Sequence, residues 1–444
     1  MGEPVPDRAA AARSAVAAVL GAGVETPAYV YDLAEVRANA ARLRAALPAP
    51  AGIYYSLKAN PHPDLLAALR AQGTAAEVSS PGELTAALAA GWAADQVLYT
   101  GPGKRDRDLA DALRAGVREV SVDSPTALDQ LARLADEAGV AVRCLLRVND
   151  ERPTGGRGLA MTGVASQFGA DTGWVLAEPD RFGDRGRLRV VGLHLFMGSN
   201  IVEVDDLLDQ FARELDTAGA VAKALAPYAR GIDVLDLGGG FGAPFATDAP
   251  PVDLTGLRTG LEALLDGDAA GWRDGRPRVV LESGRYLVGS AGTLVTQVLD
   301  VKRSHGRDVV VLDTGINHLG GMAGLRRLPP LNPHLVTPES DGPPESGGPP
   351  ESGGPPESGG PPEGGAAASP TIVAGPLCTP LDAWSRSALL PPLRPGDLLA
   401  VPNVGAYGLY ASLIAFLGHP APVEVVVEGD RPVRTSRLHL IRKD

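Results

Sequence analysis

From about residue 28 to about residue 285, short apolar runs alternate with amphipathic segments whose apolar residues recur at helical spacing. The strand-like runs are AYVYD (28–32), GIYYSLK (52–58), AAEVSS (75–80), QVLYTG (96–101), VREVSVD (117–123), VAVRCLLRV (140–148), LRVVGLHLF (188–196), DVLDLGG (233–239) and PRVVLES (277–283). Helix start signals follow several of them, such as Pro81 and the pair Ser124 and Pro125. Continuous apolar strands that alternate with helices predict parallel strands covered on both sides. The fold class is therefore α/β, and about eight units over roughly 250 residues favour a (β/α)8 TIM barrel over an open sheet.

After about residue 286 the pattern changes to β-like runs that are separated by Gly and Pro turns. These runs are GTLVTQVLDVKRS, DVVVLDTG, TIVAGPLC, GDLLAVPNVG and PVEVVVEG. Few helical patterns occur there, so the sequence predicts a second, all-β domain after the barrel.

A low-complexity segment, DGPPESGGPPESGGPPESGGPPEGGAAAS (341–369), interrupts the β-like region. It contains PPESGG three times in tandem and then a partial copy. Such a composition cannot bury apolar area, so we expect a disordered insertion in a loop rather than a repeat fold. A tolerated surface insertion is the simplest interpretation because long loops cost little stability, and a lid or a partner-docking segment is the alternative.

Composition narrows the classes of function. The chain has 444 residues and a net charge of −12, which argues for two domains and against a nucleic-acid-binding surface. Its two cysteines, Cys144 and Cys378, are too far apart for a disulfide framework or a metal-ligand motif, so we expect a reducing cytoplasm and no metal. The first residues lack signal-peptide features, and no run of about 18 apolar residues predicts a membrane span.

Candidate chemistry gathers where the predicted strands end, which is the active-site face of a barrel. A lone lysine, Lys58, ends the apolar run GIYYSLK, although a buried lysine is unfavourable unless it is paired or neutralised. The other strand-end candidates are Glu77, His194, Phe196, Ser199, Gly238, Gly239, Gly240, Glu282 and Arg285.

These residue types together fit a pyridoxal phosphate site. A lysine amine forms a Schiff base with an aldehyde, and a carboxylate facing a pyridine nitrogen keeps that nitrogen protonated. A triple glycine lets backbone N–H groups approach an anion, and an arginine binds phosphate in a bidentate manner. An aromatic side chain stacks on a flat ring.

Six motifs resemble, in order, those of the fold-type III pyridoxal phosphate decarboxylases, which include the diaminopimelate, ornithine and arginine decarboxylases. The motifs are YYSLKAN, GLHLFMGSN, LDLGGGFG, ESGRYLV, GPLCTPLD and VGAYG. The resemblance covers about residues 26 to 430 and implies an alanine-racemase-like barrel followed by a β domain. We accordingly expect residues 1–32 to join the C-terminal β domain, residues 33–285 to form the cofactor-binding barrel, and residues 286–444 to form the β domain.

The resemblance also implies a role for each matching residue. Lys58 takes the Schiff-base position and Glu282 the carboxylate position at the pyridine nitrogen. Glu77 stands where relatives usually have Asp, and His194 and Phe196 lie near the cofactor. Ser199, Gly238, Gly239, Gly240, Arg285 and Tyr407 take phosphate-binding positions. Cys378 matches a catalytic cysteine supplied by a partner subunit, which implies a homodimer with shared active sites. Taken singly, Cys378, His194 and Tyr407 would more often be packing residues.

Two departures from the family pattern bear on the substrate. Relatives commonly carry H-x-H-I-G-S, and Phe196 replaces the second histidine, which keeps a ring contact and loses a polar one. Decarboxylases of diamino acids usually have Asp or Glu after the cysteine, where this chain has Thr379. We place Thr379 and Asp382 on the substrate side. Losing the charged partner of a distal ammonium should cost roughly 2–5 kcal/mol of binding.

We therefore expect a decarboxylase that removes the α-carboxylate of an amino acid as CO2. The resemblance is nearest to a specialised-metabolism group that includes a carrier-protein-linked glutamyl decarboxylase of butirosin biosynthesis. Arg326 and Arg327 could meet an anionic group, although a solvated basic pair is the simpler interpretation. The main alternative is a decarboxylase of diaminopimelate or another free diamino acid. Three alternatives are less favoured. Glu282 argues against an amino-acid racemase, and the intact Lys58 argues against an inactive partner subunit. The β domain and the GPLC cysteine argue against a non-catalytic cofactor-binding protein, which is usually a bare barrel.

Overall fold

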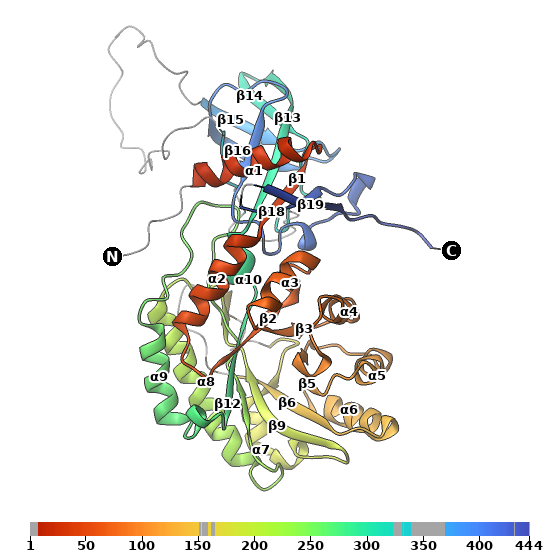
Figure 1. The fold of residues 1–444 in the computed structure, drawn as a ribbon, viewed down its shortest axis with the longest axis vertical. Helices are drawn as coiled ribbons and strands as arrows, with labels where there is room; N and C mark the ends of the chain where they lie inside the picture. The colour runs from red at the N-terminus through yellow and green to blue at the C-terminus, as the bar shows by residue number, and fades with distance from the viewer. Residues whose placement is uncertain are drawn as a thin grey trace.

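A computed structural model describes residues 8–150, 152, 159–160, 165–322, 331, 333–338, 369–429 and 431–443. Its larger part is a closed barrel of eight parallel strands, with the first strand paired to the last and each to its neighbour in the chain (Figure 1). The strands are β2 (Gly52–Ser56), β3 (Ala75–Val78), β4 (Val97–Tyr99), β5 (Glu119–Val122), β6 (Val142–Asn149), β9 (Leu188–Leu195), β11 (Val234–Asp236) and β12 (Arg278–Ser283). The predicted (β/α)8 barrel is confirmed.

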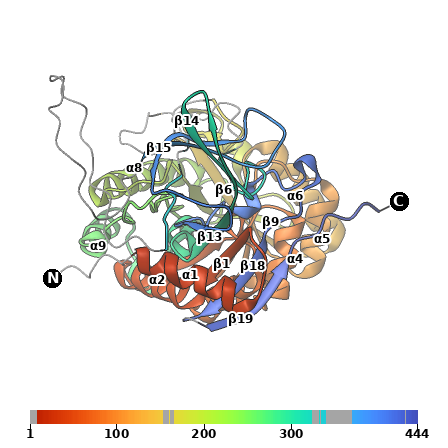
Figure 2. The ribbon, with the colours of Figure 1, turned by 90° about the horizontal axis from the view of Figure 1, so that it is seen from above.

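Helices surround the barrel, as the view from above shows (Figure 2). They are α2 (Leu33–Ala46), α3 (Pro63–Ala71), α4 (Pro81–Ala89), α5 (Asp106–Ala115), α6 (Pro125–Ala138), α7 (Thr172–Ala177), α8 (Val204–Leu225), α9 (Leu257–Asp268) and the short α10 (Arg285–Val288). The helix starts predicted at Pro81 and at Ser124 and Pro125 are N-terminal caps in the structure. The hydroxyls of Ser80 and Ser124 accept hydrogen bonds from backbone N–H groups in the first turns of α4 and α6, and proline follows each serine.

The alternation of side chains along the strands divides the barrel interior into two layers. Apolar side chains from five strands pack together in the lower layer: Tyr54, Leu98, Leu145, Val234 and Val280. Residues two positions further along share the same face, so the next layer toward the C-terminal ends holds Ser56, Thr100, Arg147, Asp236 and Glu282. Strand pairing places Glu77 beside Ser56 and His194 beside Asp236 in that layer. The barrel therefore presents a polar floor at the end where an active site is expected.

The second part of the molecule is a mixed sheet with the strand order β16-β15-β14-β13-β1-β18-β19, in which β17 also pairs with β13. The strands are β1 (Ala28–Asp32), β13 (Gly292–Ser304), β14 (Arg307–Leu312), β15 (Ser369–Ala374), β16 (Ala383–Leu390), β17 (Leu398–Val401), β18 (Val423–Glu428) and β19 (Arg431–Arg437). β1 lies between β13 and β18, so the chain begins in this sheet before it enters the barrel.

The helix α1 (Arg8–Ala22), which the sequence did not predict, packs on the mixed sheet. Its Ala15, Val16, Ala18 and Val19 form a small core with apolar residues of β1, β13 and β18. Shorter elements are the strands β7 (Leu159–Ala160), β8 (Ala170–Asp171) and β10 (Gly198–Ser199), and 3-10 turns that include η1 (Leu57–Ala59).

The mixed sheet lies over the C-terminal ends of the barrel strands (Figures 1 and 2). The segment between β17 and β18 contacts η1 directly. Tyr407 N–H donates to the Ala59 carbonyl at 2.8 Å, and the Asn60 side-chain amide donates to the Gly405 carbonyl at 2.8 Å. These bonds bring a residue of the second domain to the mouth of the barrel.

Two predicted features lie outside the described residues: the PPESGG insertion up to residue 368, and the pair Arg326 and Arg327. Ser369, predicted as the last residue of the insertion, is the first residue of β15. None of the helices in the described part of the chain combines the length and the hydropathy that crossing a membrane requires.

Candidate active site

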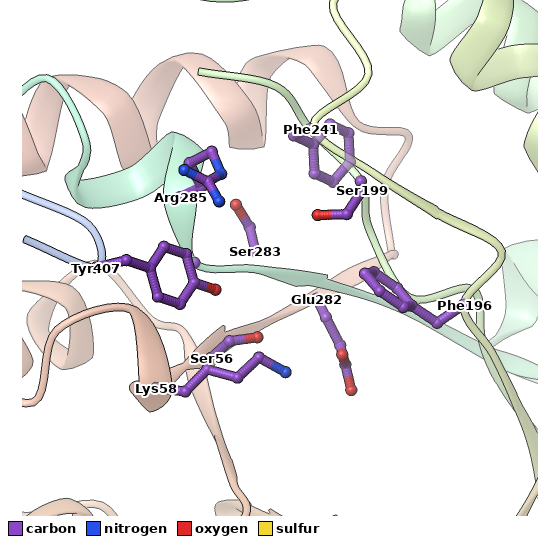
Figure 3. A pocket seen from close by; sticks show the side chains of 11 residues that line it. Ser56, Lys58, Phe196, Ser199, Phe241, Glu282, Ser283, Arg285 and Tyr407 are labelled. Carbon is purple, nitrogen blue, oxygen red and sulfur yellow. The ribbon is translucent and has the colours of Figure 1, made fainter. Parts of the chain in front are cut away.

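A pocket of about 390 Å³ opens at the C-terminal ends of the barrel strands (Figure 3). Its walls come from β2 and β12, from the loops after β9 and β11, from the first turn of α10 and from the segment that carries Tyr407. The lining residues are Ser56, Lys58, Phe196, Ser199, Gly240, Phe241, Glu282, Ser283, Gly284, Arg285 and Tyr407. Residues from five widely separated parts of the sequence thus face one space.

Lys58 follows β2 and extends into the pocket toward Glu282 (Figure 3). Protein atoms surround it, yet 47% of its side-chain surface is open to the pocket. Its Nζ lies 3.4 Å from Oε2 of the buried Glu77, whose other oxygen accepts a hydrogen bond from Thr100. Burial alone would lower the pKa of Lys58, but the charges of Glu77 and Glu282 outweigh it and raise the pKa. The Glu77 carboxylate therefore holds this amine in place, and both carboxylates favour its charged form.

Glu282 stands at the end of β12 above two other buried polar groups. Its Oε1 lies 3.5 Å from Nε2 of His194, and Nδ1 of His194 is 2.8 Å from the Ser121 hydroxyl. Asp236 accepts a hydrogen bond from Gly238 N–H at 3.0 Å through one oxygen. Among the described residues, Glu282 Oε1, His194 Nε2 and the second Asp236 oxygen have no hydrogen-bond partner.

Burial dominates the protonation of this cluster. Burial and the nearby charges of Glu77 and Asp236 raise the pKa of Glu282 well above its usual range. Burial also raises the pKa of Asp236 to about 8, in spite of its bond from Gly238. Burial and the cations Arg147 and Lys58 hold the pKa of His194 well below its usual range, so the ring is neutral. The donor atoms of these three residues lie within 4.8 Å of one another and would also suit a small cation.

The opposite end of the pocket is formed by Ser199, Ser283, Arg285 and Tyr407 (Figure 3). Gly240 also lines the pocket and lies against the Gly198 carbonyl, next to Ser199. The Arg285 guanidinium carbon lies 4.8 Å from the centre of the Tyr407 ring. Gly240 has φ +94°, a left-handed conformation that favours glycine. A Cβ on the preceding Gly239 would lie 1.8 Å from the Glu282 carbonyl oxygen, so no other residue fits there. A cation, hydroxyl groups and bare backbone together suit an anion.

Phe196 in the pocket lining contacts Arg147, which lies beneath the pocket. Phe196 follows β9 and lines the pocket, and the Arg147 guanidinium carbon lies 5.9 Å from its ring centre. The same guanidinium carbon lies 4.7 Å from the ring centre of Phe168. An aromatic side chain therefore borders the pocket beside Glu282 (Figure 3).

Cys378, Thr379 and Asp382 follow β15 and do not belong to the pocket lining. Cys378 is exposed. Asp382 is buried, and its two oxygens accept hydrogen bonds from Ile316 N–H and Leu377 N–H, both at 2.8 Å. The Asp382 carboxylate thus organises its own loop, and its contact with substrate stays a prediction, as does that of Thr379.

Comparison with known proteins identifies the architecture. A family model described as "Pyridoxal-dependent decarboxylase, pyridoxal binding domain" matches residues 33–289, more than half of the chain. The protein belongs to the pyridoxal-dependent decarboxylases. It is 30% identical over 423 residues to L-glutamyl-[BtrI acyl-carrier protein] decarboxylase of Niallia circulans, covering 94% of this chain and 91% of that protein. It is 31% identical over 426 residues to diaminopimelate decarboxylase of Methanothermobacter thermautotrophicus, covering 94% and 89%.

A solved structure shares the fold of this decarboxylase. The diaminopimelate decarboxylase of Helicobacter pylori, complexed with L-lysine, superposes with a TM-score of 0.77 and 24% identity, and the match covers 94% of each chain. The barrel and the mixed sheet are thus a shared architecture.

The residues of this decarboxylase fit pyridoxal phosphate. Glu282 Oε1 is a buried acceptor with no partner among the described residues, and a protonated ring nitrogen would supply a donor to this carboxylate. The glycine turn leaves room for close approach of an anion, and Arg285 faces the same end. Lys58 extends between these two ends. The Lys58 amine, the Glu282 carboxylate and the anion site at Arg285 therefore lie in one pocket.

Several site residues were not predicted from the sequence of this decarboxylase. Ser56, Phe241, Ser283 and Gly284 line the pocket, and Arg147, Thr100 and Asp236 lie beneath it. Ser283, Gly284 and Asp236 stand inside the motifs ESGRYLV and LDLGGGFG, so motif membership could have indicated them. Arg147 is the second-last residue of the run VAVRCLLRV, so a search near strand ends could have found it. Of the predicted set, His194 lies under Glu282 rather than in the lining.

Proposed function

We propose that this protein removes the α-carboxylate of a glutamyl group that is attached to a carrier protein. The observation that carries the decarboxylase chemistry is the single pocket that Lys58 and Glu282 share, with Glu282 Oε1 buried and unpaired below it. A buried carboxylate at one end of the pocket, an anion site at the other and a lysine amine between them match the cofactor, whose aldehyde lies between the ring nitrogen and the phosphate arm.

Pyridoxal phosphate, when bound, supplies an aldehyde and an electron-accepting ring. Lys58 is the amine that holds the aldehyde and is available to carry a proton near the reacting carbon. Glu282 would keep a proton at the ring nitrogen; His194, which is bonded to Ser121, lies 3.5 Å below its carboxylate. Ser199, Gly240 and Arg285 would hold the phosphate, and Phe196 would contact the ring.

The substrate assignment rests on the relatives and on Thr379. A relative that covers 94% of this chain is named for a glutamyl group on an acyl-carrier protein. Thr379 offers no charge for a distal ammonium, and a glutamyl side chain needs none. The second candidate is a free diamino acid such as diaminopimelate, which the 31% identical relative supports.

We propose a homodimer in which Cys378 of the partner subunit completes each pocket as a proton donor. The exposure of Cys378 and its place outside the pocket lining support this arrangement. Each site would then take Lys58 from one subunit and Cys378 from the other. Lys58→Ala and Cys378→Ala would therefore inactivate a site through different subunits. Mixing the two inactive variants in equal amounts should restore about a quarter of wild-type activity, because half of the dimers are hybrids with one intact site. No recovery, with subunit exchange demonstrated, would contradict shared sites.

The substrate is tested by CO2 release from the cofactor-loaded protein. The panel is glutamyl-loaded carrier protein, free glutamate, lysine, ornithine, arginine and meso-diaminopimelate, with Lys58→Ala as the blank. Turnover of the carrier-bound glutamyl group alone would support the proposal. Rapid turnover of a free diamino acid would overturn the argument from Thr379, and failure of every substrate, with cofactor bound, would contradict the proposed substrate.

A further inference from the structure

The helix α8 turns an unusually polar face toward the barrel. Gln210, Glu214 and Thr217 are all buried, and their spacing places them on one side of the helix. A helix that packs on a sheet normally presents apolar residues there. Each of the three instead bonds to the end of a different barrel strand. Gln210 donates to the Gly239 carbonyl, Glu214 accepts from Met197 N–H, and Thr217 donates to Asp150.

Gln210 lies directly behind the pocket wall. It is 1% exposed, and its Nε2 donates to the Gly239 carbonyl at 3.3 Å. A Cβ built on Gly198 would lie 2.7 Å from its Oε1, and one built on Gly240 would lie 3.5 Å from its Nε2. The carboxamide therefore fits between the loops that follow β9 and β11. Those loops contribute Ser199 and Gly240 to the pocket.

The bond to Gly239 constrains one peptide group. In a trans peptide the C=O of one residue and the N–H of the next point in opposite directions. Because the Gly239 carbonyl points back to α8, the Gly240 N–H points away from α8, to the side on which Gly240 lines the pocket. No acceptor for the Gly240 N–H is found among the described residues.

We propose that Gln210 is a positioning residue for the phosphate end of the site: it fixes the peptide between Gly239 and Gly240 so that the Gly240 N–H donates to the cofactor phosphate. This inference rests on the proposed function, since it requires pyridoxal phosphate in this pocket. Gln210 has no need to touch the ligand. We expect its main effect at the phosphate, because Gln210 bonds to the peptide that precedes Gly240 and not to Lys58 or Glu282.

The test compares Gln210→Met with the wild type. Methionine keeps the length and the volume of the side chain and removes the donor. Dissociation constants are measured for pyridoxal phosphate and for pyridoxal, which carries the same aldehyde and ring but no phosphate. Their ratio therefore isolates the phosphate interaction. Inorganic phosphate is titrated as a competitor in the same assay.

Gln210→Met should weaken pyridoxal phosphate binding about tenfold, leave pyridoxal binding unchanged and weaken competition by inorganic phosphate. The matched control is Thr217→Val, which removes a buried hydrogen bond from the same face of α8 but has its partner, Asp150, outside the pocket lining. It should leave both dissociation constants as in the wild type. Gln210→Leu serves as the second variant, and thermal unfolding verifies that each variant is folded.

If Gln210→Met lost affinity equally for pyridoxal phosphate and pyridoxal, or lost none, the inference would be overturned and the proposed function would still stand. A loss in Thr217→Val as large as that in Gln210→Met would also overturn it, because the effect would then be general loosening of α8. Failure of the wild type to bind pyridoxal phosphate would refute the proposed function itself, and the inference with it.

Discussion

The substitution Gly239→Ala tests how closely the two loops of the site are packed. A Cβ on Gly239 would lie 1.8 Å from the Glu282 carbonyl oxygen, whereas real Cβ contacts do not fall below 3.0 Å. The loop must therefore move by about 1 Å, and the atom in its way is backbone. Overpacking of this kind typically costs 1–3 kcal/mol, and we expect about 3 kcal/mol here because no flexible side chain can yield.

The movement of the glycine turn also displaces Glu282. Glu282 N–H donates to the Gly238 carbonyl at 2.5 Å, so a shift of the glycine turn is transmitted to the Glu282 backbone. A misplacement of about 1 Å reduces catalytic rates about 100-fold. We expect Gly239→Ala to lose about that much in kcat and to bind the cofactor more weakly.

Urea unfolding of the cofactor-free protein measures the change in the free energy of unfolding, and CO2 release measures the change in kcat. The matched control is Gly219→Ala on α8, where a Cβ would meet no atom within 4 Å and φ is not positive. That change should stabilise the protein by up to about 1 kcal/mol, since alanine has the higher helix propensity. The reasoning would be refuted if Gly239→Ala matched the wild type in both stability and kcat.

Three further predictions concern single side chains. Lys58→Ala should abolish CO2 release and borohydride fixation of the cofactor, and peptide mapping that still found fixed cofactor would exclude Lys58 as its attachment point. Glu282→Gln should lower kcat on the order of 10²-fold in steady-state assays, because an amide cannot keep the ring nitrogen protonated; an unchanged kcat would contradict its role. Burial raises the pKa of Glu424 from its usual 4.5 to about 7, in spite of the hydrogen bond from the Tyr410 hydroxyl. The raised pKa means that Glu424 contributes stability fully below about pH 4.5 and loses it as the pH rises to about 7, by about 3 kcal/mol. Glu424→Gln should remove this dependence of the unfolding free energy on pH, measured by urea unfolding across the same pH range. An identical pH dependence in the variant would contradict the role of Glu424.

The elements that could be predicted from the sequence are those whose burial leaves a local pattern. Barrel strands are covered on both sides, so each appears as a continuous apolar run, and the serine-proline starts of α4 and α6 are local caps. The strands β16 and β19 escaped prediction because exposed polar residues interrupt them and no long apolar run forms. The alanine-rich α1 escaped because it contacts the sheet through small residues and lacks a wide apolar stripe.

For the site, the sequence by itself determined the chemical types: one lysine, a carboxylate, an arginine and a glycine turn at strand ends, each within a motif. The tertiary structure alone decided how they meet. Closure of the barrel brings Glu282 to Lys58 although more than two hundred residues separate them, because β12 pairs with β2. The same closure gathers Asp236, His194 and Glu282 under the pocket, where loss of water shifts their pKa values. Burial and distance between remote residues have no local signature in a chain, so they emerge only when the strands pair.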